Sequence, residues 1–152
     1  MKPMALFRGE VDTRIEIEAP MARVWDLVAT VENYGKWNPF VVMGRGTPVL
    51  NGFITVRARP SERVAKTFTP RITRLVPGRE LRWLGHFLFP GLVDGEHIHE
   101  LVPLSENRTL YVHRDEFAGL LVPLVWPRLE RVTRKGFIAM NEALKREAEK
   151  RG

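Results

Sequence analysis

Residues 125–146 read VWPRLERVTRKGFIAMNEALKR, and in this stretch the periodicity of the chain becomes helical. Apolar residues recur at steps of three and four, while basic and polar residues take the other side. The apolar series is Val125, Leu129, Val132, Gly136, Met140 and Leu144. We predict an amphipathic helix of about six turns, beginning with Pro127 because proline suits the first turn of a helix.

The sequence before this helix is organised mainly as strands. Residues 11–18 alternate between apolar and polar side chains, which predicts a half-buried strand that Pro20 ends. Two short helices are expected next, one with an apolar face over residues 24–28 and one over residues 31–37. Apolar runs between turn residues predict further strands near residues 40–50, 53–59, 63–75, 80–89, 95–104 and 108–117.

Two local signals refine these strands. Asn51-Gly52 between residues 49–50 and 53–54 predicts a two-residue hairpin. Pro70 lies inside the 63–75 strand and lacks a ladder donor, so we expect a bulge or an edge position there. About seven consecutive strands with short connections predict one curved, meandering antiparallel sheet. With helices on one side the fold class is α+β, and a long helix across a curved sheet leaves room for a hollow.

Composition limits the function classes. The chain has 152 residues, 44% of them hydrophobic and 28% charged, which is typical of a globular protein. It contains no cysteine, which excludes disulfides, thiolate catalysis and cysteine-based zinc sites. The net charge of +6 is spread along the chain without a recognition motif, so we expect no nucleic-acid partner. Residues 1–10 hold no apolar run long enough for a signal peptide, and we expect a cytoplasmic protein.

Short motifs are spread in order along nearly the whole chain. They are residues 15–20 (IEIEAP), 24–25 (VW), 34 (Y), 37–39 (WNP), 81–85 (LRWLG), 95–97 (GEH), 113–119 (HRDEFAG), 136–137 (GF) and 140–145 (MNEALK). In this order they resemble the START-like (SRPBCC) superfamily, specifically its polyketide cyclase/dehydrase and lipid-transport branch. The resemblance implies a helix-grip fold, a single START-like ligand-binding domain over residues 1–152 and a deep apolar pocket. It implies no particular reaction, because members include carriers, receptors and cyclases.

Strand parity predicts which side chains line such a pocket. In the 80–89 strand, Trp83 and Phe87 share one face and suit a cavity wall. A hairpin around residues 105–107 places side chains of the next two strands on the same face. The cross-strand pairs in this register are Leu104 with Arg108, Leu101 with Tyr111, His99 with His113, and His97 with Asp115. The predicted ligand-binding residues are Trp83, Phe87, His97, His99, Leu101, Tyr111, His113, Asp115, Phe117 and, from the long helix, Met140.

His97, His99, His113, Asp115 and the Tyr111 hydroxyl form a polar patch in this otherwise apolar wall. The patch has three interpretations: a hydrogen-bonded structural network, groups that orient a ligand or act as acid and base, or a metal site. His-x-His opposite His-x-Asp offers nitrogen and oxygen ligands that suit zinc or iron. We expect neither a metal nor a cofactor, since this spacing is no known metal signature. Asn141 lies at the edge of the helical stripe and is assigned to neither face.

Two apolar loops fall at the same end of the predicted meander. Residues 87–93 read FLFPGLV and residues 118–126 read AGLLVPLVW, and the turn at Pro60-Ser61 lies beside them. Loops are usually polar, so this end is a cavity mouth, an oligomer contact, a membrane-touching rim or simply a cover over the core. A homodimer and a transient membrane contact are therefore open alternatives.

These features predict the binding, for transport or sensing, of an apolar small molecule such as a lipid, polyketide or aromatic metabolite. The alternative is a cyclase, dehydratase or hydrolase that uses the His/Asp patch as acid and base. The chain has neither a Gly-x-Ser-x-Gly motif nor a glycine-rich phosphate-binding loop. Docking of a protein partner on the apolar loops is a third hypothesis. We expect a binding protein rather than an enzyme and assign no catalytic residue.

Overall fold

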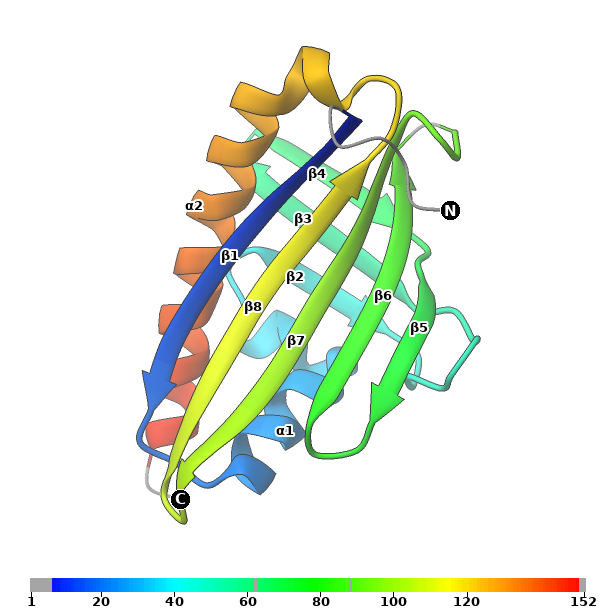
Figure 1. Ribbon diagram of the computed structural model, residues 1–152. Helices are drawn as coiled ribbons and strands as arrows, with labels where there is room; N and C mark the ends of the chain where they lie inside the picture. Colours follow the sequence, from blue (N-terminus) through cyan, green and yellow to red (C-terminus); the bar gives the residue numbers. More distant parts are fainter. Residues whose placement is uncertain (1–6, 62, 88, 151–152) are drawn as a thin grey trace.

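The computed structural model describes residues 7–61, 63–87 and 89–150. Its strands are β1 (Arg8–Ile17), β2 (Val41–Arg45), β3 (Thr55–Ser61), β4 (Val64–Phe68), β5 (Arg71–Val76), β6 (Glu80–Phe87), β7 (Val93–Ser105) and β8 (Arg108–Ala118). Its helices are α1 (Met21–Ala29), the 3-10 helix η2 (Val31–Lys36) and α2 (Val122–Glu149). Figure 1 shows how these elements are arranged.

The strands form two antiparallel sheets. The larger has the order β1-β8-β7-β6-β5, and the smaller has the order β2-β3-β4. In Figure 1 the larger sheet lies in front of the smaller one, α2 runs along β1, and α1 lies toward the lower end. The curved antiparallel sheet and the long C-terminal helix confirm the predicted α+β, helix-grip fold.

The predicted 63–75 strand is divided in two, which gives eight strands in the described residues instead of about seven. Pro70 lies in the break between β4 and β5, as expected for a residue without a ladder donor. Its carbonyl instead accepts a hydrogen bond from the Ile54 amide at 3.1 Å. The break separates the predicted single meander into two sheets, which a single bridge between Phe53 and Arg71 joins again.

The predicted two-residue hairpin at Asn51-Gly52 is wrong. β2 ends at Arg45, which pairs with Thr55, so residues 46–54 form the whole connection. Asn51 does turn the chain, with a φ of 67°, but its amide and the Gly52 carbonyl both bond to Ile72 of β5 at 2.8 Å. The turn signal was correct, whereas the flanking residues pair with a different strand.

The helix α2 begins at Val122, five residues before the predicted start at Pro127. Pro123 occupies the first turn that was assigned to Pro127, and Pro127 lies inside the helix. Because Pro127 has no N–H, the Pro123 carbonyl lacks its intrahelical donor. No described helix is long and apolar enough to cross a membrane.

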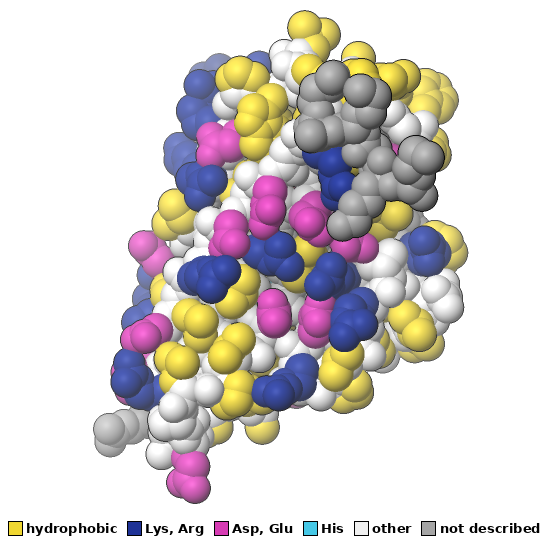
Figure 2. Space-filling model, in the orientation of Figure 1, with side chains coloured by type: hydrophobic (Ala, Val, Ile, Leu, Met, Phe, Trp, Pro, Cys, Tyr) yellow, Lys and Arg dark blue, Asp and Glu magenta, His cyan; other side chains and the backbone are white. Residues whose placement is uncertain are grey.

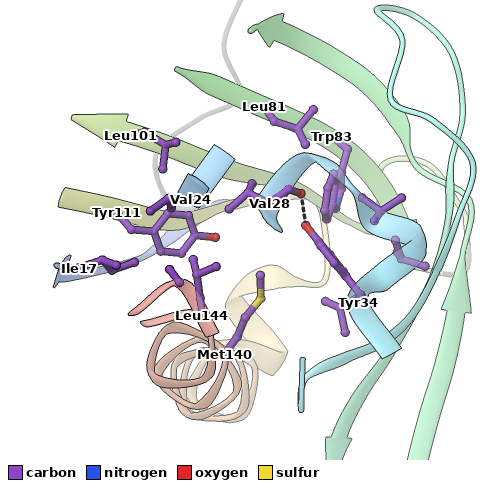
Figure 3. Packing of buried hydrophobic residues seen from close by; sticks show 14 of the residues in the cluster. Ile17, Val24, Val28, Tyr34, Leu81, Trp83, Leu101, Tyr111, Met140 and Leu144 are labelled. Carbon is purple, nitrogen blue, oxygen red and sulfur yellow. Dashed lines mark hydrogen bonds between the residues drawn. The ribbon is translucent and has the colours of Figure 1, made fainter. Parts of the chain in front are cut away.

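Buried side chains form two clusters. The larger one joins the sheet to α1, η2 and the C-terminal half of α2, and Figure 3 shows Tyr34, Leu81, Tyr111, Met140 and Leu144 within it. The hydroxyl of Tyr34 donates to the Val28 carbonyl at 2.6 Å, near the end of α1 where carbonyls lack intrahelical partners. The smaller cluster contains Val11, Val93, Phe117, Val122 and Phe137.

The outer face of the larger sheet is covered by paired charges. Figure 2 shows basic and acidic side chains interspersed over it. Arg82 bonds to both Glu80 and Glu96, and Arg114 bonds to Glu10 at 3.0 Å. Most of these charges are matched on the same face, so we place the candidate site on the inner face.

Candidate ligand-binding cavity

A cavity of about 510 Å³ lies between the two sheets and α2. Val56 and Ala58 of β3 form part of one wall, and Trp83 and Phe117 form part of the opposite wall. Phe137 lines it from α2. Members of both buried clusters line the cavity, so it lies where the two clusters meet.

Two glycines make room on the sheet side of the cavity. Gly85 and Gly95 are paired across β6 and β7, and both line the cavity. A Cβ atom on Gly95 would lie 3.1 Å from Oδ1 of Asp115 and 3.2 Å from the ring of Phe117. The absence of a side chain at Gly95 therefore lets the Asp115 carboxyl and the Phe117 ring occupy the wall.

The predicted register of the central hairpin is present, with His97 opposite Asp115, His99 opposite His113 and Leu101 opposite Tyr111. At the hairpin end a bulge puts Ser105 rather than Leu104 opposite Arg108. The side chains of the three pairs His97–Asp115, His99–His113 and Leu101–Tyr111 are all buried.

The cavity covers only part of this inward face. The predicted ligand-binding residues that line it are Trp83, Phe87, His97, Asp115 and Phe117. The others are packed in the interior without lining it: His99, Leu101, Tyr111, His113 and Met140. Figure 3 shows Leu101, Tyr111 and Met140 within the larger cluster, where helices cover the rest of the sheet face.

A chain of hydrogen bonds determines which nitrogen of His113 carries the proton. The backbone carbonyl of His113 accepts from the Thr13 hydroxyl at 2.8 Å. Having used its proton, Thr13 Oγ1 accepts from Nδ2 of Asn141 at 2.9 Å. The Asn141 amide is thereby oriented, and its Oδ1 accepts from Nδ1 of His113 at 2.7 Å. His113 is therefore protonated on Nδ1, and its Nε2 carries a lone pair.

The same reasoning extends to His97 on the neighbouring strand. Its Nε2 lies 2.5 Å from Nε2 of His113, which can only accept, so His97 donates and is protonated on Nε2. Burial and the neighbouring His99 and His113 lower the pKa of His97 well below 6.5, and the ring is neutral at pH 7. Nδ1 of His97 is then an unprotonated nitrogen on a ring that lines the cavity.

Phe137 covers these two imidazoles from α2. Its ring lies flat on His113, with centroids 3.8 Å apart and planes 6° apart, and lies 4.8 Å from the His97 centroid. Burial lowers the pKa of His113 to about 3, although the hydrogen bond to Asn141 acts in the opposite direction. His113 is thus a neutral internal support for His97 and does not itself line the cavity.

Asp115 is the acidic member of the cavity wall. Its side chain is buried and its Oδ1 has no hydrogen-bond partner in the described part of the chain. Burial, followed by the charges of Glu96 and Glu116, raises the pKa of Asp115 well above 3.8. A carboxyl group in these surroundings favours its protonated form, which donates a hydrogen bond.

His99 is the remaining member of the polar group and is more deeply buried than His97. Its Nδ1 lies 2.5 Å from the Tyr111 hydroxyl, and its Nε2 lacks a partner among the described residues. Burial and the neighbouring His113 lower the pKa of His99 well below 6.5. Burial, with a smaller contribution from Tyr34, raises the pKa of the Tyr111 phenol well above 10. Both groups are uncharged at pH 7.

His97, His99 and His113 are the described residues best placed to hold a metal ion, with one ligand atom of each within 4.8 Å of the others. In the present arrangement both nitrogens of His113 and Nε2 of His97 already take part in hydrogen bonds. The ring planes of His97 and His113 are also nearly parallel, at 16°. This geometry favours the interpretation as a hydrogen-bonded network.

Several residues of the site were not identified from the sequence. Thr133 and Phe137 line the cavity, whereas Gly136 was the position assigned to the inward stripe. Asn141 is buried and belongs to the same face. The spacing of Thr133, Phe137 and Asn141 at steps of four was the available signal, because residues four apart lie on one face of a helix.

The two apolar loops do lie together, at the end of the cavity where α2 begins. Leu120 and Leu121 donate backbone hydrogen bonds to Gly91 and Leu92 at 2.9 and 3.0 Å. Leu88, which belongs to the first loop, lies outside the described residues. β3 ends at Ser61 and β4 begins at Val64, and Lys66 of β4 lies 4.6 Å from the Phe87 ring centroid. β4 therefore lies beside the first of these loops.

Comparison with known families identifies the chain. The sequence model described as "Polyketide cyclase / dehydrase and lipid transport" matches residues 8–149. The chain belongs to this family. The match includes every strand and helix of the structure, and it confirms the resemblance to START-like proteins. No curated protein matches the sequence.

Two solved structures share the fold of this family member at low sequence identity. An aromatase/cyclase, Zhui from Streptomyces sp. R1128, is 23% identical and superimposes with a TM-score of 0.75, covering 93% of this chain and 94% of its own. A START superfamily protein from Mycobacterium smegmatis is 16% identical, with a TM-score of 0.76 and coverages of 92% and 97%. These likenesses establish the fold.

Proposed function

We propose that this protein binds an apolar small molecule, such as a lipid, polyketide or aromatic metabolite, in the cavity between its two sheets. The observation that carries the proposal is the cavity of about 510 Å³ with walls of Val, Phe and Trp side chains. Ligand sites commonly have this size and combine apolar walls with a few polar groups. The domain over residues 1–152 acts here as a carrier or sensor in the cytoplasm.

Acid–base catalysis of the cyclase or dehydratase type is the second candidate. It is favoured by His97 and Asp115, which both line the cavity. We rank it second because the lowered pKa of His97 makes its imidazole a weak base at pH 7. The variant Asp115→Asn would distinguish ligand binding from acid–base catalysis. Asparagine keeps a hydrogen-bond donor at this position but removes the proton that a catalytic acid would transfer.

Filling the cavity is expected to abolish ligand binding. Ala58 of β3 is half-buried and lines the cavity, so the indole of Ala58→Trp would occupy the space of the ligand. We expect the affinity for a naphthalene or long-chain fluorescent probe to fall at least about 100-fold, as for a ligand deprived of its pocket. Titration of the probe with the purified variant measures the effect.

The matched control for this experiment is Arg57→Trp. Arg57 is the preceding residue of β3, is exposed and bonds to Thr67 at 2.9 Å. The Arg57→Trp variant introduces the same indole on the opposite face of the strand. Equal affinity of wild-type protein and both variants would show that the probe binds elsewhere and would contradict the proposal.

We also propose that the apolar rim of the cavity touches anionic membranes when the ligand is exchanged. Phe89, Leu120 and Leu124 are 69%, 67% and 79% exposed, and α2 continues from them with exposed Arg128 and Arg131. Apolar side chains flanked by basic ones suit an anionic bilayer surface. Wild-type protein is expected to co-sediment with phosphatidylserine vesicles at low salt and to be released at high salt.

Two variants of α2 test this contact. Leu124→Glu removes the most exposed apolar side chain of the rim and is expected to abolish co-sedimentation. Ile138→Glu changes an apolar residue of the same helix, 46% exposed, and is expected to leave it unchanged. If Leu124→Glu instead converts a dimer into a monomer during gel filtration and leaves vesicle binding intact, the rim is a homodimer contact.

A further inference from the structure

The polar wall of the cavity has a fixed hydrogen-bond polarity, which constrains the chemistry of the ligand. The bond chain starts at the His113 carbonyl, which can only accept, and each following link then has a single possible direction. Its members are Thr13 of β1, Asn141 of α2, His113 of β8 and His97 of β7. The chain ends at the ring of His97, whose remaining nitrogen, Nδ1, is an acceptor.

Asp115 supplies the opposite polarity beside this acceptor. It is the direct cross-strand partner of His97 and lines the same cavity. Side chains in such pairs have Cβ atoms about 4.5–5.5 Å apart, a spacing that one small polar group of a ligand can bridge. Oδ1 of Asp115 has no partner among the described residues, and the wall around it contains Phe117 and Gly95. A protonated carboxyl in such surroundings donates.

We infer that the cavity selects ligands in which an apolar body carries an uncharged group that presents one hydrogen-bond donor and one hydrogen-bond acceptor side by side. A carboxamide, a protonated carboxylic acid and an enol beside a carbonyl belong to this class. The donor of the ligand binds Nδ1 of His97, and its acceptor binds the Asp115 carboxyl. This inference rests on the proposed function and specifies which apolar ligands the site takes.

Asn141 is a positioning residue in this arrangement. It does not line the cavity, but its amide determines the tautomer of His113, and His113 in turn determines that of His97. The amide is held in one orientation because its Nδ2 donates to a threonine oxygen whose own proton is already used. Among the described residues Asn141 is the partner that holds the His113 proton on Nδ1, so without it the polarity at His97 is lost.

Proton positions on the histidines test the inference without any ligand. Long-range ¹H–¹⁵N NMR of the wild-type protein at pH 7 is expected to show His113 protonated on Nδ1 and His97 protonated on Nε2. Asn141→Leu is expected to change the tautomer populations of both rings. A His97 protonated on Nδ1, or on both nitrogens, in the wild-type protein would overturn the inference.

A matched set of naphthalene ligands tests the selectivity. Naphthalene-2-carboxamide has the donor and the acceptor, its N,N-dimethyl derivative keeps only the acceptor, and 2-naphthoate and 2-naphthylmethylammonium carry a negative and a positive charge. We expect the carboxamide to bind about 10-fold more tightly than each of the others, because each leaves a buried polar group unpaired. Asp115→Val is expected to reduce the carboxamide affinity about 10-fold, and Asp115→Asn less than 3-fold.

The outcomes distinguish the inference from the proposed function. If all four ligands bind equally well and Ala58→Trp abolishes their binding, the cavity is a ligand site without the inferred selectivity. If the ammonium binds most tightly, the cavity holds an Asp115 carboxylate and the inference is overturned. If none of the four binds, the proposal of an aromatic ligand fails, whereas the proton positions of His97 and His113 remain a separate test.

Discussion

The free energy of unfolding is expected to fall steeply as the pH is lowered from 6 to 4.5, by as much as about 3 kcal/mol for each pH unit. The cause is the buried group of His97, His99 and His113, whose pKa values are all lowered by burial. In the unfolded chain these imidazoles have pKa values near 6.5 and bind protons below that pH. The folded protein excludes those protons, for His113 down to a pKa of about 3, so acid favours the unfolded state.

Asp115 contributes with the opposite sign. Burial, with the charges of Glu96 and Glu116, raises its pKa well above 3.8, so the folded protein holds this proton where the unfolded chain has released it. Three protons taken up on unfolding and one released leave a net uptake of two, which gives the slope above. Above about pH 7.5 the histidines no longer contribute, and retention of the Asp115 proton is expected to lower stability by about 1.4 kcal/mol per pH unit until that carboxyl ionises. The maximum therefore lies near pH 7.

Urea unfolding at a series of pH values measures this profile. His99→Gln is expected to reduce the slope below pH 6 by about 1.4 kcal/mol per pH unit, one proton's contribution. His86→Gln is the matched control, because His86 lies on β6, outside the buried group, and is bonded to Asp94 at 2.7 Å. A wild-type profile that is flat between pH 4.5 and 6 would show that the folded protein admits protons to these histidines.

Gly44→Ala is expected to lower the free energy of unfolding by about 3 kcal/mol, as for an overpacked position that cannot relax. A Cβ atom on Gly44 of β2 would lie 2.2 Å from the carbonyl oxygen of Val31 and 3.0 Å from its Cβ. The clash is with the backbone of η2, so it cannot be relieved by a side-chain rotation. Either β2 or η2 must move, and both pack against each other beside the cavity wall.

Gly85→Ala provides the comparison for this effect. Gly85 is also a strand glycine, but the nearest atom to an added Cβ is 3.9 Å away, on Pro70. We expect the free energy of unfolding of this variant to lie within about 0.5 kcal/mol of the wild-type value, because the substitution causes no steric conflict. Similar losses for the two variants would show that the close approach of β2 to η2 is not the cause.

The sequence was most informative where its periodicity and a short turn act together. The register of His97 with Asp115 and of His99 with His113 follows from strand parity and a short hairpin. The same reasoning failed at Asn51-Gly52, because a turn signal defines the local backbone and not the strand that pairs with its flanks.

The extent of the cavity could not be predicted in the same way. Strand parity assigns Leu101 and Phe117 to the same face of the sheet. However, α1, η2 and α2 cover Leu101 and leave Phe117 beside the cavity. Asn141 shows the same limit, since its role depends on Thr13, which is 128 residues away in the chain. Such contacts are set by helix packing over the sheet, on which local periodicity carries no information.

The pairing of β1 with β8 has a consequence for how the protein is made. β1 is an edge strand whose one partner in the sheet is β8, from Arg8 opposite Ala118 to Ile17 opposite Thr109. A nascent chain must therefore extend beyond Ala118 before its first strand can be incorporated, and α2 then packs on that strand. Contacts of such long sequence separation form late and slowly. The cavity is thus assembled only after β8 and α2 have been synthesised, and its apolar walls remain exposed to chaperones and to aggregation until then.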